Sequence, residues 1–211
     1  MINNLAGKKA PKEILEDIEK LLEAYYVNKP DVNIQNQKVS FGTSGHRGSS
    51  TKSSFNEDHI LAITQALCEY RKNAGITGVM HIGIDTHALS TPAQITALQV
   101  FLANEVHCKI AAENSYTPTP VMSFTIIESN KNSKDLNDGV IITPSHNPPC
   151  DGGFKYNTPN GGPSDTDVTS VIEKRANEIL KDGLKDVKFI AKENIYQSKF
   201  LEVADFITAY V

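Results

Sequence analysis

The chain has no tryptophan, and none of its apolar runs approaches the roughly eighteen residues that a membrane-spanning helix needs. Residues 1–12 are polar and also lack the apolar centre of a signal peptide. We therefore expect a cytoplasmic protein that makes no contact with a membrane.

Cysteine and clustered positive charge are also scarce. Cys68, Cys108 and Cys150 are odd in number and form no C-x-x-C pair, so we expect free thiols and no cysteine metal site. The net charge of −4 and the lack of a basic block argue against nucleic acid as a partner. Any cluster that binds an anion should be local.

The pattern of apolar residues predicts alternating helices and strands. At 211 residues and 39% apolar content, the chain is long enough for one sizeable domain. Helices are predicted from Pro11 to before Pro30, over 56–73, from Thr91, over 117–127 and over 164–182. Strands are predicted over 78–84, 106–111, 139–143 and 187–190, followed by an amphipathic stretch over 200–211. This alternation is typical of an α/β sheet covered on both faces.

The apolar stripe of the first predicted helix allows two interpretations. Ile14, Leu15, Ile18, Leu21 and Tyr25 recur at helical spacing. Such a stripe can form a partner surface, but amphipathic helices of globular proteins more often bury it, so we expect core packing.

The strongest signal lies in residues 143–155, which read T-P-S-H-N-P-P-C-D-G-G-F-K. The predicted strand over 139–143 stops at Pro144, and the residues up to 163 are so rich in proline and glycine that we predict a loop without secondary structure. Loops of that length are usually functional or disordered, and the low charge here favours function.

Ser145 is a candidate nucleophile at the end of this strand. His146 follows it directly and Lys155 lies ten positions on, but the loop lacks the G-x-S-x-G turn of hydrolases. Serine needs a base or an electrostatic partner, so phosphoryl transfer, which depends on positioning and charge stabilisation, suits this setting better. From spacing alone, an exposed proline-rich turn is an equally good interpretation.

A second signal is the segment over 41–50, which reads F-G-T-S-G-H-R-G-S-S. Gly42, Gly45 and Gly48 permit unusual backbone angles that turn amide groups toward an anion, and Arg47 could bind a phosphate through two parallel hydrogen bonds. Taken alone, the segment also fits an ordinary glycine-rich turn.

Together the two segments resemble the α-D-phosphohexomutases. T-P-S-H-N-P-P followed by G-G-F-K is similar to the phosphoserine loop of that family, with most likeness to its glucose-specific bacterial branch, and F-G-T-S-G-H-R-G-S-S is similar to its first active-site segment. The resemblance implies that Ser145 carries a phosphoryl group that Arg47 faces, with His146 and Lys155 stabilising charge and handling a proton. It leaves open which of these last two moves the proton.

The resemblance also implies further contacts and a fold. Thr43, Ser44, His46 and Asn147 would bind substrate or phosphate. Mg²⁺ would be the cofactor, with a phosphoryl oxygen on Ser145 as one ligand and the other ligands outside this chain. The implied fold is α/β, with a mixed, mostly parallel sheet sandwiched between helices. Many relatives carry arginine where His87 stands, which leaves a substrate role for His87 in doubt.

The implied reaction interconverts glucose 1-phosphate and glucose 6-phosphate through glucose 1,6-bisphosphate. The chain lacks the family's aspartate-rich metal loop, sugar-recognition loop and carboxyl-terminal phosphate-binding loop. We therefore expect an inactive amino-terminal fragment with a helical extension over 1–40, a phosphoserine-bearing domain over 41–190 and the start of a connection over 191–211. In the intact protein it should contact the missing domains and a sugar phosphate.

Two alternatives remain. The first keeps the chemistry but changes the sugar to mannose, glucosamine or a pentose, and the second is a sugar-phosphate-binding domain without turnover. A binding module needs the cations but not the serine, so retention of Ser145 beside Arg47 and Lys155 argues against the second alternative.

Overall fold

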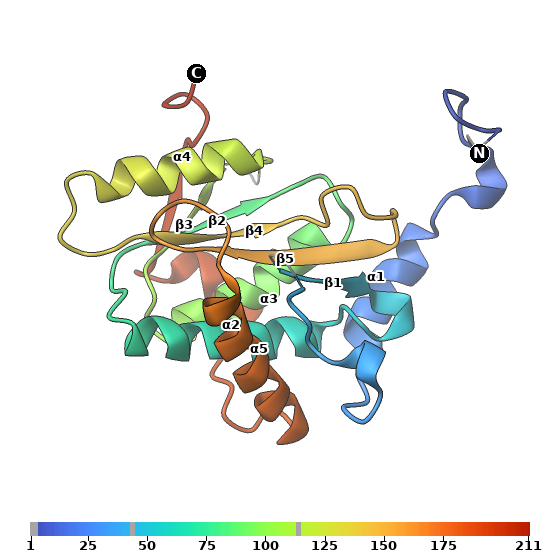
Figure 1. The fold of residues 1–211 in the computed structure, drawn as a ribbon, viewed down its shortest axis with the longest axis horizontal. Coiled ribbons are helices and arrows are strands. Elements are labelled where there is room, and N and C mark those ends of the chain that lie inside the picture. The colour runs from blue at the N-terminus through green and yellow to red at the C-terminus, as the bar shows by residue number, and fades with distance from the viewer. Residues whose placement is uncertain (1–3, 43–44, 113–114) are drawn as a thin grey trace.

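A sheet of six strands forms the centre of the computed structural model, which describes residues 4–42, 45–112 and 115–211 (Figure 1). Its strand order is β1-β5-β4-β2-β3-β6. The strands are β1 (His46–Ser49), β2 (Met80–Ile84), β3 (Cys108–Ala111), β4 (Asp138–Ile142), β5 (Asp151–Asn157) and β6 (Leu201–Ala204).

The sheet combines a parallel part with an antiparallel part. β4, β2, β3 and β6 pair in parallel, whereas β5 runs antiparallel to both β4 and β1. Every residue of β2 and β4 is buried, as expected of parallel strands covered on both faces. The antiparallel strands lie at one side of the sheet and carry the candidate site.

Helices cover both faces of the sheet (Figure 1). α2, α3 and α5 lie on one face, and α4 lies on the other. The helices are α1 (Ile18–Val27), α2 (Glu57–Asn73), α3 (Ser90–Ala103), α4 (Thr119–Asn130) and α5 (Thr166–Lys181), with short 3₁₀ helices at Lys12–Ile14, Gln35–Gln37, Ser50–Lys52 and Lys192–Gln197. This arrangement confirms the predicted α/β class with a mostly parallel sheet between helices.

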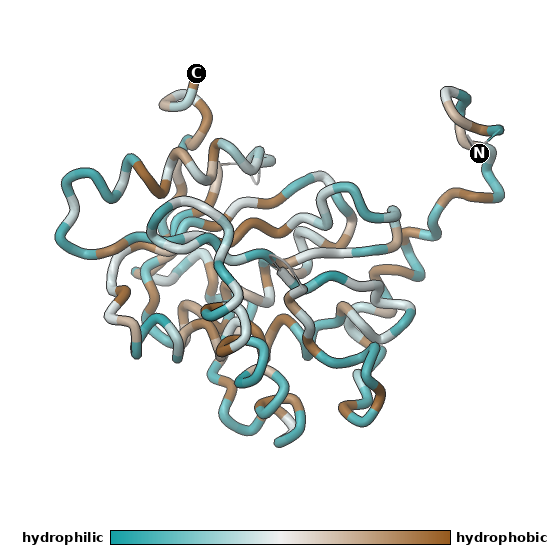
Figure 2. Tube along the Cα trace, in the orientation of Figure 1, coloured by the Kyte–Doolittle hydropathy of each residue, from teal (hydrophilic) through white to brown (hydrophobic). Residues whose placement is uncertain are grey.

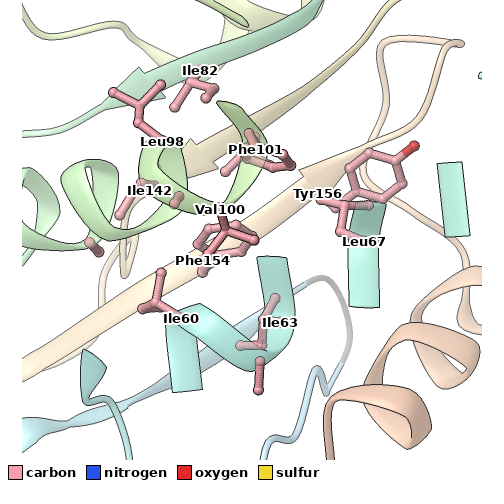
Figure 3. Close-up of a cluster of buried hydrophobic side chains, with 14 of the residues drawn as sticks. Ile60, Ile63, Leu67, Ile82, Leu98, Val100, Phe101, Ile142, Phe154 and Tyr156 are labelled. Atoms are coloured by element: carbon pink, nitrogen blue, oxygen red, sulfur yellow. The ribbon is translucent and has the colours of Figure 1, made fainter. Parts of the chain in front are cut away.

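The main core lies between the sheet and α2, α3 and α5. Side chains from α2, α3, β2, β4 and β5 meet there, and Phe154 and Tyr156 of β5 are fully buried in it (Figure 3). Burying one such aromatic ring stabilises the fold by about 1.5–3 kcal/mol. Because neighbours on a strand point to opposite faces, these two rings place Lys155 on the face that α4 partly covers.

A buried ion pair ties α2 to the sheet. The Arg71 guanidinium donates to both carboxylate oxygens of Asp138 at 3.1 and 2.9 Å and to the Gly78 carbonyl at 2.7 Å. The Tyr156 hydroxyl donates to the same carboxylate at 2.7 Å. Each charge is therefore paired and hydrogen-bonded, which a buried ion pair needs in order not to destabilise the fold.

The first predicted helix is shorter than expected. α1 begins at Ile18, where the Asp17 side chain accepts a hydrogen bond from the Lys20 amide. Leu21 and Tyr25 are buried as predicted, and the Tyr25 hydroxyl donates to Thr96 Oγ1 at 3.0 Å. Ile14, Leu15 and Ile18, by contrast, are about half exposed, and the segment before α1 projects from the body (Figure 1). Core packing therefore holds only for the second half of the stripe.

Four strands differ from their predictions. β5 lies inside the stretch predicted as an unstructured loop, and β1 lies inside the glycine-rich segment. No strand forms over 187–190, because the Lys188 amide bonds to Gln65 Oε1 and the Ile190 amide to the Gln99 carbonyl. β6 forms further on, within the predicted amphipathic stretch.

Helix starts and polar segments show smaller differences. α3 begins at Ser90, one residue before the predicted start at Thr91, and α5 begins at Thr166, two residues after the predicted start at 164. α2 follows Asn56, whose amide donates to His59 Nδ1 at 3.1 Å, close to the predicted start at 56. The connector between α4 and β4 is polar apart from Leu136 (Figure 2).

Candidate functional site

The candidate site lies where the neighbouring parallel strands β4 and β2 end. The Asp85 amide, just past β2, donates to the Ile142 carbonyl at the end of β4 at 3.2 Å. The connections around β2 diverge from this point, because α3 covers one face and α4 the other (Figure 1). In open α/β sheets, ligands bind beyond the carboxyl ends of strands at such a point.

Ser145 is presented to solvent in an unusual backbone conformation. Thr143 and Pro144 are buried, whereas Ser145 and His146 are exposed. The φ angle of Ser145 is +68°, in the left-handed region, and its amide donates to Thr143 Oγ1 at 3.0 Å. Such a conformation costs about 1–3 kcal/mol in a residue other than glycine and often marks a functional site.

Pairing of β1 with β5 brings two cations to one side of the sheet. Arg47 lies opposite Gly153, and Lys155 lies two positions further along β5, so both side chains leave from the same face. Across the other edge of β5, Lys155 is opposite Ile141, which packs beneath α4. Arg47 and Lys155 therefore share a face with each other but not with the main core.

Gly153 allows β5 to approach the start of the serine loop, which comprises residues 143–150 between β4 and β5. A Cβ atom at position 153 would lie 2.2 Å from the Thr143 carbonyl oxygen and 2.8 Å from Pro144 Cα. Because both neighbours are backbone, neither can rotate away. This contact, together with the pairing of Arg47 with Gly153, places the two cations beside the backbone that leads into Ser145.

The surroundings of Lys155 lower the pKa of its amine. Partial burial is the main cause and the nearby Arg47 charge adds to it, while Asp85 acts in the opposite direction. Two like charges held on one face favour an anion between them. The lowered pKa also makes the neutral, proton-accepting form of Lys155 more accessible than that of an exposed lysine.

His46 does not lie at this site, which contradicts the prediction that it binds phosphate. As the residue before Arg47 on β1, it points to the opposite face, where its buried ring stacks on Phe55 at 5.8 Å and on His59 at 5.1 Å between centroids. Burial, helped by the His59 ring, lowers the pKa of His46 to about 3. A neutral, buried imidazole on the core side cannot contact a phosphate beside Arg47.

Only one of the three glycines over 41–50 has the unusual backbone angle that was predicted for them. Thr43 and Ser44 lie outside the described residues. Gly42 has a φ of +52°, in the left-handed region, but Gly45 and Gly48 are needed for space. A Cβ atom at Gly45 would lie 2.7 Å from Lys155 Cγ, so this segment closes over the stem of the lysine.

Two residues just past β2 lie at the site, although they were not predicted from the sequence as site residues. Asp85 lies within electrostatic range of Lys155. The His87 ring reaches the serine loop through a 2.7 Å contact between Nε2 and the Pro149 carbonyl. The D-T-H sequence directly after a buried strand could have indicated this. In a parallel sheet, the turn that follows one strand lies next to the loop that follows the neighbouring strand.

Asn147 belongs to the internal bonding of the loop. Its Nδ2 donates to Asp151 Oδ2 at 3.1 Å, and the Asp151 amide donates to the Pro148 carbonyl at 2.9 Å. The side chain thereby links the loop to the first residue of β5.

The described residues contain no group of three or more histidine, cysteine, aspartate or glutamate side chains placed to hold a metal ion. Within the same ranges, no helix is long and apolar enough to cross a membrane. A pocket of about 460 Å³ lined by Cys68, Thr77 and His107 lies by the amino ends of β2 and β3, away from Ser145.

Fold and site together define an α/β domain that presents an exposed serine beside two cations. Residues 38–182 match the family model of phosphoglucomutase/phosphomannomutase, alpha/beta/alpha domain I. The chain therefore belongs to the phosphoglucomutase/phosphomannomutase family.

Individual relatives agree with this assignment. A phosphoglucomutase of Komagataeibacter xylinus is 54% identical over 211 residues, which are 100% of this chain and 38% of that protein. A phosphoglucomutase of Entamoeba histolytica is 30% identical over 144 residues, 66% of this chain and 25% of that protein. This chain thus spans well under half the length of either relative.

Solved structures share the fold. The open form of pp63/parafusin from Paramecium, a phosphoglucomutase, superposes with a TM-score of 0.67 at 20% identity, over 87% of this chain and 35% of that one. A phosphoglucomutase/phosphomannomutase family protein from Burkholderia thailandensis gives a TM-score of 0.55 at 21% identity, over 82% and 35%.

Proposed function

We propose that this chain is the serine-bearing amino-terminal part of a phosphoglucomutase, which interconverts glucose 1-phosphate and glucose 6-phosphate. The observation that carries the proposal is the placement of Ser145. It is exposed, held at a φ of +68°, and set at a strand end beside the face that bears Arg47 and Lys155. The 54% identity to a phosphoglucomutase over the whole chain supports the choice of reaction.

Each site residue has a distinct proposed role. Ser145 carries the phosphoryl group, and Arg47 binds its oxygens through charge-assisted hydrogen bonds. Lys155 stabilises the charge of the transferring group and handles the proton, because its lowered pKa suits proton transfer. His146, exposed next to the serine, also stabilises charge and is the alternative group for handling the proton. Asn147 binds the substrate, and Thr43 and Ser44 are further phosphate contacts.

The transfer exchanges one phosphate ester bond for another. The bond from Ser145 Oγ to phosphorus breaks while the free C6 hydroxyl oxygen of glucose 1-phosphate bonds to phosphorus. The hydroxyl proton passes to the neutral amine of Lys155, and the resulting ammonium gives a proton to Ser145 Oγ as that oxygen leaves phosphorus. Glucose 1,6-bisphosphate results, and the reverse step at the other phosphate regenerates the phosphoserine and releases glucose 6-phosphate. In phosphoryl transfer, positioning of the reactants and electrostatic stabilisation account for most of the rate enhancement.

Magnesium does not fit a site built from this chain alone. Mg²⁺ prefers six oxygen ligands in octahedral geometry, and the described residues offer no cluster of that kind. We propose that a phosphoryl oxygen on Ser145 is this chain's contribution and that carboxylates elsewhere in the complete protein supply the rest. When bound, such an ion neutralises charge on a transferring phosphoryl group.

We also propose how the polypeptide is organised. Residues 1–40 form a helical extension, 41–190 the phosphoserine-bearing domain and 191–211 the start of the connection to further domains, although β6 in the last segment still pairs with β3. The relatives' greater length supports the presence of those domains. We place the protein in the cytoplasm, as expected of an enzyme of glucose phosphate metabolism.

The test is formation of glucose 6-phosphate from glucose 1-phosphate with Mg²⁺ and a trace of glucose 1,6-bisphosphate. The 211-residue chain should be inactive, and the complete polypeptide active. Ser145→Ala in the complete polypeptide should abolish turnover and phosphate incorporation, whereas Ser170→Ala, at an exposed serine of α5, should change neither. Full activity of Ser145→Ala would refute the mechanism.

A panel of hexose and pentose 1-phosphates with the same protein determines the sugar. A preference for mannose 1-phosphate would keep the mechanism and replace the substrate.

A further inference from the structure

The His87 side chain connects two loops at the carboxyl ends of β2 and β4. Its Nε2 lies 2.7 Å from the Pro149 carbonyl oxygen, and its Nδ1 lies 3.1 Å from the Leu89 amide nitrogen. The imidazole therefore spans the space between the start of α3 and the loop that carries Ser145. The ring is half-buried, so water competes only in part for these bonds.

The two partners determine the protonation state of the ring. A carbonyl oxygen can only accept a hydrogen bond, so Nε2 must carry the proton that it donates to Pro149. A backbone amide can only donate, so Nδ1 must be the unprotonated acceptor. Both bonds form together only in the neutral Nε2–H tautomer.

The turn that carries His87 is itself held firmly. Asp85 Oδ1 accepts from the His87 amide at 2.9 Å and from the Ser90 hydroxyl at 2.6 Å. Ser90 Oγ also lies 3.2 Å from the Ile142 carbonyl, at the end of β4. The backbone of His87 is thus fixed to the same strand end from which the serine loop departs.

The serine loop, by contrast, has little to hold it from outside. Among the described residues, the hydrogen bonds of positions 144–150 stay within the loop and β5, except for the one from His87 to Pro149. Pro148 and Pro149 have no N–H groups to donate, so the carbonyl is the group that this part of the loop can offer. The φ angle of +68° at Ser145 requires such external support.

We propose that His87 is a positioning residue, which holds the serine loop through Pro149 and so keeps Ser145 in its left-handed conformation facing Arg47 and Lys155. The contribution to catalysis rests on the proposed mutase function, whereas the structural contribution does not. His87 need not touch the sugar phosphate for this role.

The first experiment measures the loop in the 211-residue chain, without any activity. Amide hydrogen exchange is followed at Ser145 and Asp151, whose amides donate within the loop, in the wild type and in three variants. His87→Leu should speed exchange roughly fivefold, the factor expected for loss of one neutral hydrogen bond. His87→Gln keeps a donor near the Nε2 position and should stay within about twofold of the wild type. Thr86→Ala, an exposed neighbour in the same turn, is the matched control and should change nothing.

The second experiment measures kcat and KM for glucose 1-phosphate with the same variants of the complete polypeptide. Displacing the nucleophile should lower kcat and kcat/KM together by about tenfold in His87→Leu, with recovery in His87→Gln.

A third measurement concerns the tautomer of the ring. The nitrogen chemical shifts of the His87 side chain in the wild type should show the neutral Nε2–H tautomer.

The outcomes separate the two proposals. Unchanged exchange in His87→Leu, or a different tautomer, would overturn the positioning role whatever the activity. Faster exchange with unchanged kcat would also overturn it, since the loop would then be held without benefit to Ser145. Faster exchange in His87→Leu of the 211-residue chain, together with a complete polypeptide that shows no mutase activity even as wild type, would reject the proposed function and leave the structural role of His87 in place.

Discussion

Replacing Gly153 with alanine tests how the site is assembled. The added Cβ atom would lie 2.2 Å from the Thr143 carbonyl oxygen, 2.7 Å from its carbon and 2.8 Å from Pro144 Cα. The shortest of these distances is roughly 1 Å less than the van der Waals contact distance between carbon and oxygen. All three atoms are backbone, so β5 and the start of the serine loop must move apart.

The expected cost is that of overpacking a rigid interior, about 1–3 kcal/mol in the free energy of unfolding. For a chain of this length, that corresponds to a fall in Tm of roughly 3–10 °C. Urea denaturation followed by circular dichroism measures the free energy, with an unchanged m-value as the check that unfolding stays cooperative. In the complete polypeptide, the same shift should separate Ser145 from Arg47 and Lys155 and lower kcat.

Gly162→Ala is the matched control. A Cβ atom there would meet only the Asn160 side chain, with Oδ1 at 3.2 Å, a contact that a small shift of that side chain relieves. Its unfolding free energy should change by less than about 1 kcal/mol. If Gly153→Ala were as stable and as active as this control, the close approach of β5 to Pro144 would not be what builds the site.

Three further predictions concern burial and backbone strain. Arg71→Met should cost about 3–5 kcal/mol in urea unfolding, because the buried Asp138 carboxylate loses its cation, and retention of wild-type stability would contradict the buried pair. Burial lowers the pKa of His46 to about 3 and, together with the nearby Lys109 charge, that of His81 to about 4. Because the unfolded state binds these protons near pH 6.5, stability should be complete above that pH and fall by about 2 kcal/mol per histidine at pH 5, as urea midpoints at both pH values would show. At position 145, Ser145→Gly should be more stable than Ser145→Ala by about 1 kcal/mol, since only glycine adopts the left-handed angle freely, and the reverse order would contradict the observed φ.

Much of the parallel part of the sheet follows from local sequence. The runs before Asp85 and Pro144 are mostly apolar, with a histidine at position 81, and they form β2 and β4 close to the predicted bounds. A short, nearly continuous apolar run indicates a strand that is buried on both faces, and it can be recognised from a few neighbouring residues alone. The position of Ser145 just past β4 was predictable for the same reason.

The antiparallel strands were not predictable in this way. β5 begins with Asp151, Gly152 and Gly153, a composition that normally indicates a turn. Both glycines are there because of distant neighbours: a Cβ atom would strike the Phe55 ring at position 152 and the Thr143 carbonyl at position 153. Such neighbours become known only once the chain is folded.

The error at His46 follows from the same cause. If residues 41–50 form a turn, then His46 and Arg47 can both face an anion. On a strand, adjacent side chains point to opposite faces, so only one of them can. The structure directs Arg47 to the site and His46 into the core, where it stacks on Phe55.

The spacing between Ser145 and Lys155 is therefore a matter of strand register. β4 and β5 pair with Ile142 opposite Phe154 and Ile141 opposite Lys155, so the chain returns along the strand from which the serine leaves. Added residues at the loop tip would cost little closure entropy, but they would move Ser145 relative to the lysine. Removing one residue from β5 before Phe154 would do more. It would turn Lys155 into the main core and Phe154 toward the face that carries Arg47, because a shift of one position exchanges the two faces of a strand.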